Sequence, residues 1–320
     1  MYLPYLRGKQ YELIALRELC SVMAADRENI SPIIEPVKDS STLKSCISCL
    51  AQNDINFSVI INPSVGKFRE EPNHIDTILN YLGDLLGNYQ NWQIGVLIDR
   101  NTSVDLITRH VLRLGFDKKR FTLIHNAIRK DISNLLNEFS NGDHIENNVI
   151  NYTKINDRRR YHRAFLRETL VSLDDFFASQ VRNADYGDVD ESEFSVEHLY
   201  FREEGFKGFS DFLTIGEPYS DTGFLPYAVA IHLSYADEEK NIKVKHFVSN
   251  SNDDASDVAG KFAEALDKLI EWCNENNILE TEAIKEFKDL HGRGHFPGLG
   301  SIKKLSVMHH IELVLSLLRS

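Results

Sequence analysis

The chain has 320 residues, of which 42% are apolar and only 8 are proline. This composition is typical of a globular chain with one large domain or two modest ones, and it excludes a disordered or collagen-like protein. The 48 acidic and 36 basic residues leave a net charge of -12, which disfavours general nucleic-acid binding. No apolar run is long enough to cross a membrane, and charged residues appear early at the N-terminus where a signal peptide is apolar. We therefore expect a cytoplasmic protein with no membrane association.

Two of the four cysteines have a spacing that redox or metal chemistry uses. Cys46 and Cys49 form a CxxC pair, but Leu43, Ile47 and Leu50 recur around them at helical spacing. No second CxxC completes a zinc site. We interpret both thiols as small residues of a helix.

Short apolar segments alternate with amphipathic segments through the first half of the chain. The predicted strands cover residues 3–9, 30–37, 57–63, 92–99, 120–126 and 146–155. The predicted helices between them cover residues 10–25, 40–53, 74–88, 101–115 and 127–140. Alternating strands and helices indicate parallel strands with helical crossovers, and the nearly continuous apolar character of the strands indicates a sheet that is buried on both faces.

Strand number decides between two architectures. The segments 209–218 and 226–235 have the pattern of strands seven and eight, and eight strands favour a closed (β/α)8 barrel of the TIM type. An open parallel α/β sheet is the alternative. It lacks the glycine-rich dinucleotide fingerprint after the first strand, where the sequence reads LRGKQYE.

The rest of the chain is assigned to the same domain, so that one (β/α)8-like domain spans residues 1–320. We expect an insertion at about 157–205 and a C-terminal extension at about 242–320, which contains an added strand and helices. The strand at 241–250 follows a turn and is expected to pair with 226–235 as a hairpin, which would make His232 and His246 neighbours. Whether residues 176–205 fold over the barrel mouth or away from it is left open.

Polar residues end most of the apolar segments. In a barrel of this kind the chemistry lies at the carboxyl ends of the strands, so these residues are the candidates for a site. They are Glu35, Asn62, Asp99 with Arg100, His125 with Asn126, Asn151, Glu217 and His232. Because side chains alternate along a strand, Glu35 shares a face with Ile33, and Asp99 shares one with Gly95. We expect these polar ends to point into the barrel mouth.

Two kinds of chemistry fit such a set. Carboxylates that lie close together take separate acid and base roles, so we hypothesise a catalytic set of Glu35, Asp99, Glu217 and His232. The same oxygens are ligands that a divalent cation such as Mg²⁺ prefers, although the sequence does not identify a metal. The alternative is that each polar residue only caps a helix or starts a turn.

Basic residues form a second candidate set. Arg7 and Lys9 end the first strand, and Arg293 lies in the glycine-rich segment HGRGHFPGLGS. Together with Asn62 and Asn126, these residues are predicted to bind an anionic ligand such as a nucleotide or a phosphate ester. The basic segment 157–168 could contribute as well, or it could be the solvated face of a helix.

Several segments carry a resemblance to a known family. They are MYLPYLRGKQYELIALREL at the start, ISPIIEPV and VIINP, and later GFKGFSDFLTIGEPY, AVAIHLSY and VKHFVS. Together they resemble the beta protein family, over most of the chain and least between about 127 and 195. The resemblance implies an accessory protein of phages or bacterial mobile elements that works with a protein partner. It implies no catalytic residues.

Three functions follow from these observations. The first is a component of an antiphage defence or phage-conflict system, with a protein partner and an anion-binding or anion-sensing barrel mouth. The second is a metal-assisted hydrolase with a carboxylate-rich site. The third is a non-catalytic interaction scaffold.

Overall fold

The computed structural model describes residues 1–139, 144–157, 160–220 and 226–319. The chain divides into two compact units, Met1–Asp175 with Leu199–Asp211, and Phe176–His198 with Phe212–Ser320. This differs from the single domain that we expected over residues 1–320. The physical reason is strand pairing: part of the expected insertion pairs with a strand of the C-terminal part and leaves the barrel sheet. No helix in the described residues is long and apolar enough to cross a membrane.

The first unit contains eight parallel strands in the order β1-β2-β3-β4-β5-β6-β7-β9. Tyr2 bridges Ile30 on one side and Phe209 on the other, and the N–H of Leu3 donates to the carbonyl of Phe209 at 2.9 Å. The last strand is thereby joined to the segment before the first strand, and the sheet closes. The strands are β1 (Tyr5–Leu6), β2 (Ile33–Ile34), β3 (Phe57–Ile60), β4 (Trp92–Ile98), β5 (Phe121–His125), β6 (Ile145–Asn151), β7 (Leu170–Asp174) and β9 (Gly208–Asp211). The prediction of a closed barrel is confirmed.

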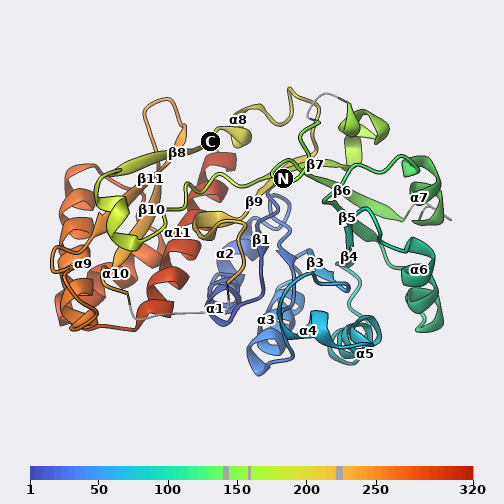
Figure 1. Ribbon diagram of the computed structural model, residues 1–320, viewed down its shortest axis with the longest axis horizontal. Coiled ribbons are helices and arrows are strands. Elements are labelled where there is room, and N and C mark those ends of the chain that lie inside the picture. Colours follow the sequence, from blue (N-terminus) through green and yellow to red (C-terminus); the bar gives the residue numbers. More distant parts are fainter. Residues whose placement is uncertain (140–143, 158–159, 221–225, 320) are drawn as a thin grey trace. The chain divides into compact units, whose positions relative to one another are not determined.

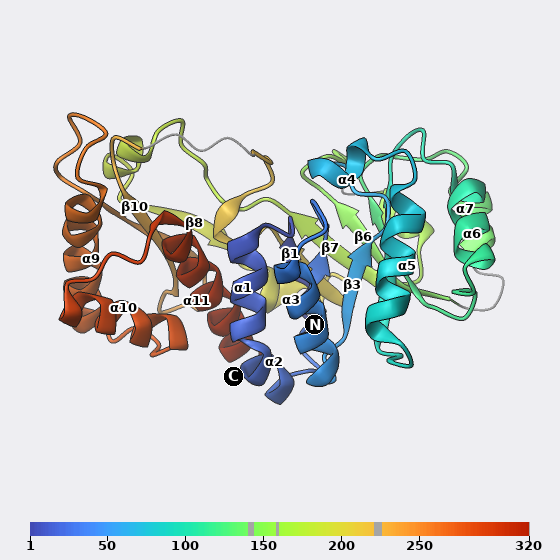
Figure 2. The ribbon, with the colours of Figure 1, turned by 90° about the horizontal axis from the view of Figure 1, so that it is seen from below.

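Helices form the first five crossovers and cover the outer face of the sheet. Figure 2 shows α1, α3 and α5 side by side along the first strands. Helix α3 illustrates the local cause, because the Ser40 side chain caps its first turn and the apolar positions Leu43, Ile47 and Leu50 are buried. The helices are α1 (Gln10–Glu18), α2 (Cys20–Ala25), α3 (Ser41–Gln52), α4 (Gly66–Glu70), α5 (His74–Leu86), α6 (Val104–Arg113) and α7 (Ile132–Phe139). Cys46 and Cys49 lie on α3 as free thiols, as interpreted from the sequence.

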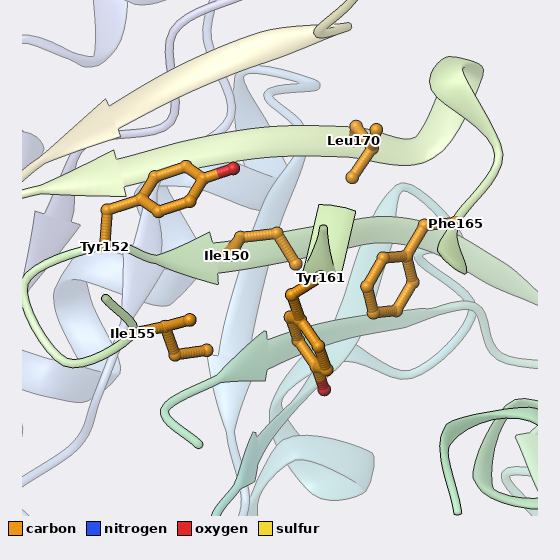
Figure 3. Packing of buried hydrophobic residues seen from close by; sticks show 6 residues of the cluster. All are labelled: Ile150, Tyr152, Ile155, Tyr161, Phe165 and Leu170. Carbon is orange, nitrogen blue, oxygen red and sulfur yellow. The ribbon is translucent and has the colours of Figure 1, made fainter. Parts of the chain in front are cut away.

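Between β6 and β7 the described residues of the crossover include two 3-10 turns, η1 (Tyr161–Ala164) and η2 (Arg167–Thr169). An aromatic and aliphatic cluster packs there on the outer face of the sheet. Figure 3 shows Tyr161 next to Phe165, whose ring centroids are 5.3 Å apart. His125 also belongs to this outer face, because its Nδ1 lies 3.2 Å from the Tyr161 hydroxyl and its Nε2 lies 3.1 Å from Asn148 Oδ1.

The second unit is built on an antiparallel sheet in the order β10-β11-β8. Its strands are β8 (Glu191–Ser195), β10 (Ala230–Ala236) and β11 (Ile242–Val248). The expected hairpin is confirmed, and His232 lies opposite His246 in its register. The helices are α9 (Val258–Glu275), α10 (Glu282–Arg293) and α11 (Leu299–Arg319), drawn in orange to red in Figure 1. The short elements are η3 (Asn183–Gly187) and η4 (Leu213–Ile215), while α8 (Glu197–Tyr200) spans the point where the chain returns to the first unit.

The predicted positions of barrel strands seven and eight were wrong. The seventh strand is β7, inside the expected insertion, and the eighth is β9, which covers only the first part of the segment 209–218. The segment 226–235 contains β10 and belongs to the antiparallel sheet. The cause is the tight turn after β10, where the N–H of Asp237 donates to the carbonyl of Asn241 at 3.0 Å and Lys240 has a φ of 65°. That turn reverses the chain at once, so the neighbouring strand is antiparallel.

Candidate ligand site at the carboxyl end of the barrel

Contacts that pass over β4 show which side chains point into the barrel. The Ser58 hydroxyl on β3 donates to Thr122 Oγ1 on β5 at 2.8 Å, although β4 lies between these strands. Asn147 Nδ2 on β6 donates to the same oxygen at 3.0 Å. Side chains alternate along a strand, so the residues two and four positions further on share the inward face. At the carboxyl end these are Asn62, Asn126 and Asn151.

Glu35 is the most enclosed polar group at this end, which we call the barrel mouth. Its side chain is 0% exposed and accepts four hydrogen bonds. Oε2 accepts from the Tyr5 hydroxyl at 2.7 Å and from Arg7 Nη1 at 2.5 Å. Oε1 accepts from the backbone N–H and the hydroxyl of Ser64, at 2.6 and 2.8 Å. The carboxylate therefore fixes the positions of Arg7 and of the loop after β3.

This arrangement decides against Glu35 as a general base or a metal ligand. Two carboxylate oxygens have about four acceptor positions, and the protein already supplies four donors. The sequence singled out Glu35 and Arg7, and the structure joins them in one buried ion pair. The sequence analysis did not single out Tyr5 or Ser64. Tyr5 lies two residues before Arg7 on the same face of β1, which is the signal that would have identified it.

The loop from β1 to α1 is held tightly against this cluster. Gly8 has a φ of +60°, and a Cβ at this position would lie 2.7 Å from the carbonyl oxygen of Glu35, so only glycine fits. The N–H of Arg7 donates to the buried Glu12 at 2.7 Å. Lys9, partly buried, is the N-cap residue of α1. The two basic residues expected at the end of the first strand are thus at the mouth.

The Asn62 side chain forms two hydrogen bonds with the backbone of the neighbouring strand. Its Nδ2 donates to the carbonyl of Leu97 and its Oδ1 accepts from the N–H of Leu97, both at 2.9 Å. The side-chain amide thereby continues the pairing of β3 with β4 beyond the last residue of β3. Both polar atoms of the Asn62 side chain are therefore used within the sheet.

Asp99 is exposed and follows β4. Its N–H donates to Thr102 Oγ1 at 2.8 Å, and Arg129 Nη1 donates to the carbonyl oxygens of Asp99 and Thr102 at 3.2 and 3.0 Å. Arg129 is anchored in turn by Asp131, through Nη2 at 2.6 Å. These hydrogen bonds hold the backbone after β4 in place, while Asp99 itself is exposed.

Asn126 and Asn151 form the remaining pair of the mouth. His125 lies opposite Ile150 in the pairing of β5 with β6, so the next residues on the two strands are neighbours. Asn151 Nδ2 donates to Asn126 Oδ1 at 2.8 Å. Asn151 is 2% exposed and Asn126 is partly buried.

Three predicted site residues do not end barrel strands. Glu217 follows η4, His232 lies within β10, and Arg293 is the last residue of α10, where it pairs with Asp289. All three belong to the second unit. Glu217 and His232 were misplaced with strands seven and eight. Arg293 was misplaced because helix α10 continues through the first three residues of the glycine-rich segment before Gly294 ends it in a left-handed conformation. The catalytic set that motivated the hydrolase hypothesis is therefore not assembled by barrel strands.

The described arginines of the basic segment after β6 lie at the protein surface. Arg158 and Arg159 lie outside the described residues, and Arg160, Arg163 and Arg167 are exposed. No group of three His, Cys, Asp or Glu side chains in the described part of the chain could hold a metal ion. The described residues therefore provide no such set of ligands for the divalent cation that we hypothesised.

The second unit has a histidine pair, in which His246 is buried and His232 is partly buried. The Nδ1 atoms of His232 and His246 are 2.9 Å apart, and Ser192 Oγ lies 3.2 Å from His246 Nε2. Burial lowers the pKa of His232 to about 3 and that of His246 to about 4. Both rings are neutral at neutral pH, and Phe177 and Tyr186 pack against them. The Asp190 carboxylate offsets only part of the effect of burial on His246, and the pair acts as part of the core.

A cavity of about 260 Å³ lies beside this sheet, against α9. Its two lysines already have partners: Lys245 Nζ is 2.6 Å from Asp190, and Lys268 Nζ donates to the carbonyl of Val248 at 2.6 Å. The other lining residues are Gly187, His246, Phe247, Glu271, Trp272 and Glu275. The lysine charges are thus committed within the protein.

Comparison with known proteins adds little to this geometry. No protein-family model matches the sequence, and no curated protein matches it significantly. Among solved structures, a crystal structure of N-acetylneuraminate lyase from Mycoplasma synoviae matches with a TM-score of 0.35 and 11% identity, over 66% of this chain and 66% of that chain. The match spans slightly less than two thirds of the lyase chain. Similarity at this level assigns neither a fold nor an activity, and the barrel is defined by its own strand pairing.

Proposed function

We propose that the protein is a component of a bacterial antiphage defence or phage-conflict system, that it acts with a protein partner, and that its barrel mouth binds or senses an anionic ligand, a nucleotide or another phosphate ester. The observation that carries ligand binding is the polar lining of the mouth by Arg7, Glu35, Asn126 and Asn151. Burying polar groups costs free energy, which a barrel that served only as packing would avoid.

The anion preference follows from the β1–α1 loop. Arg7 is held in one orientation by Glu35, so little side-chain entropy is lost when its guanidinium binds a ligand oxygen. Lys9 adds a second cation, and the amino terminus of α1 begins at the next residue. Helix amino termini favour anions because their first N–H groups lack partners within the helix.

The defence role and the partner rest on the resemblance to the beta protein family. The segments that carry it include residues 1–19, 30–37 and 205–219. The first two of these contain Arg7, Lys9 and Glu35, so the resemblance and the mouth share residues. A sensor that binds a small ligand and passes the signal to a partner would use both.

Ligand binding is tested by thermal unfolding of the full chain with inorganic phosphate, ribose 5-phosphate and nucleoside monophosphates. A ligand that binds the native state raises the unfolding temperature. We expect a rise with phosphorylated ligands that is reduced in Lys9→Gln and unchanged in Lys118→Gln, an exposed lysine just before β5, at the opposite end of the barrel. No rise with any phosphorylated compound overturns the anionic ligand.

The biological role is tested in the native host. Deletion of the gene should change the plating efficiency of at least one phage, and a tagged copy expressed from its own locus should co-purify with one protein in fixed proportion. The Lys9→Gln variant should fail to restore the phenotype, whereas Lys118→Gln should restore it. Unchanged infection together with the absence of a partner would refute this role.

A further inference from the structure

Asn151 carries a buried acceptor that the protein leaves unused. Its side chain is 2% exposed, and its Oδ1 has no hydrogen-bond partner in the described residues. Leaving a buried acceptor unpaired costs about 1–3 kcal/mol, and such atoms are few in native proteins. The amide nitrogen of the same residue is well placed, 2.8 Å from Asn126 Oδ1. The side chain is therefore held by its nitrogen, and its oxygen remains an acceptor for a hydrogen-bond donor.

Asn126 supplies the complementary group. Its Oδ1 is occupied by Asn151, and no hydrogen bond of its Nδ2 is found within the described residues. The pair therefore presents one acceptor, Asn151 Oδ1, and one donor, Asn126 Nδ2. Reversing both amides would exchange these roles and still leave one donor beside one acceptor.

We propose that Asn126 and Asn151 form a subsite for an uncharged, nucleobase-type edge, in which an N–H or NH2 donor lies next to an oxygen or nitrogen acceptor. The ligand donor binds Asn151 Oδ1, and Asn126 Nδ2 donates to the ligand acceptor. Amide side chains recognise base edges through such paired hydrogen bonds. This inference rests on the proposed function and narrows its ligand from phosphate esters in general to nucleotides.

The position of the subsite in the ring supports a nucleotide. Strands β5 and β6 lie across the closed sheet from β1, where Arg7 and Lys9 are placed. A ligand with a base at one end and a phosphate at the other would span the mouth between an uncharged amide pair and a cationic loop. A sugar phosphate without a base would leave the amide pair unused.

The chain offers a matched control in Asn147. This residue lies on the same face of β6, is 1% exposed, and also has an Oδ1 without a partner in the described residues. Its Nδ2 donates to Thr122, and Val149 separates it from the mouth. Replacing Asn147 removes a comparable buried amide away from the mouth.

The test is equilibrium binding of AMP, UMP, adenosine, uridine and ribose 5-phosphate to the full chain and to Asn151→Leu, Asn126→Ala and Asn147→Leu. We expect a nucleoside monophosphate to bind more tightly than ribose 5-phosphate. Asn151→Leu and Asn126→Ala should weaken its binding by about tenfold, the usual effect of losing a buried hydrogen-bond partner. Ribose 5-phosphate should bind all variants equally, and Asn147→Leu should behave as the wild type.

The choice of ligands and variants tests this subsite separately from the anionic site. Nucleotide binding that is unchanged by both mouth variants overturns the subsite and leaves the proposed function standing. Nucleosides that bind while phosphate compounds add nothing would retain the subsite and overturn the anionic ligand. Failure of every nucleoside and nucleotide to bind the wild type overturns the subsite outright. Asn126→Ala, at a partly buried position, decides the outcome if Asn151→Leu does not fold.

Discussion

At the scale of single residues, the ion pair between Arg7 and Glu35 is the main internal support of the barrel mouth. Glu35→Gln removes the charge that faces the Arg7 guanidinium and leaves a cation that is 7% exposed. We expect a loss of about 3–5 kcal/mol in the free energy of unfolding, the usual cost of breaking a buried pair by changing one partner. Urea unfolding measures it. The double variant Arg7→Met/Glu35→Leu should recover most of the loss, whereas additive losses would contradict this account.

Single-residue predictions from the sequence succeeded where strand period alone decides orientation. Glu35 shares the inward face of the sheet with Ile33, as expected. Roles were harder to predict, because a role depends on which side chains arrive from other strands. Asn62 illustrates this, because its pairing with the Leu97 backbone depends on the neighbouring strand.

At the scale of elements, one buried histidine ties together α10, α11 and β10. His309 on α11 accepts at Nδ1 from the Thr281 hydroxyl and donates from Nε2 to the carbonyl of Ser234, both at 2.8 Å. The Thr281 oxygen also caps α10, because it accepts from the N–H of Ile284 at 3.2 Å. The hydroxyl thus serves the helix and the histidine at once.

Thr281→Val keeps the shape of this side chain and removes both hydrogen bonds. We expect the second unit to lose about 1–3 kcal/mol of stability, from the lost cap and the unpaired histidine nitrogen. Thr281→Ser retains the hydroxyl and should stay close to the wild type. Chemical denaturation monitored by circular dichroism distinguishes the two, and equal losses in both variants would assign the effect to the methyl group.

Element type was predictable where periodicity is strong, and element partners were not. The segment 226–235 was correctly assigned as a strand, but its apolar pattern does not state which sheet it joins. β7 was missed because the turns η1 and η2 precede it and the polar segment 183–193 follows it, and the described residues of these two segments contain no α-helix that would mark a crossover. The connection between two strands decides whether they pair parallel or antiparallel. Whether that connection is a tight turn or a long segment that joins another sheet is difficult to recognise from local sequence.

At the scale of the whole molecule, buried neutral histidines should make stability depend on pH. Burial lowers the pKa of His309 and His246 to about 4 and that of His232 to about 3, all in the second unit, and lowers that of His125 in the first unit to about 4. Between these values and 6.5 the unfolded chain binds more protons than the folded one. The free energy of unfolding therefore falls as pH drops below 6.5, by about 1.4 kcal/mol per pH unit for each such histidine.

The second unit should accordingly unfold at a higher pH than the first. The two tryptophans report on the units separately, because Trp92 lies on β4 and Trp272 on α9. In the single-tryptophan variants Trp92→Phe and Trp272→Phe, we expect the emission of Trp272 to change first on acidification. His309→Gln should shift that change to lower pH in the Trp92→Phe background, and His295→Gln, at an exposed position, should not. Coincident transitions of both tryptophans would contradict the prediction that the second unit unfolds at a higher pH than the first.

The closure of the sheet by its first three residues has a consequence for synthesis on the ribosome. Met1 and Leu3 bond to Phe209, so seven strands of the barrel can be made before the partner of the N-terminal segment has left the exit tunnel. Until then the nascent chain has two unpaired strand edges, at Tyr2 and at β7, and such edges are templates for association between chains. The segment 176–198 emerges in this interval but finds β11 only after residue 242 is made. A pause in translation within this interval should therefore increase aggregation more than a pause after residue 250.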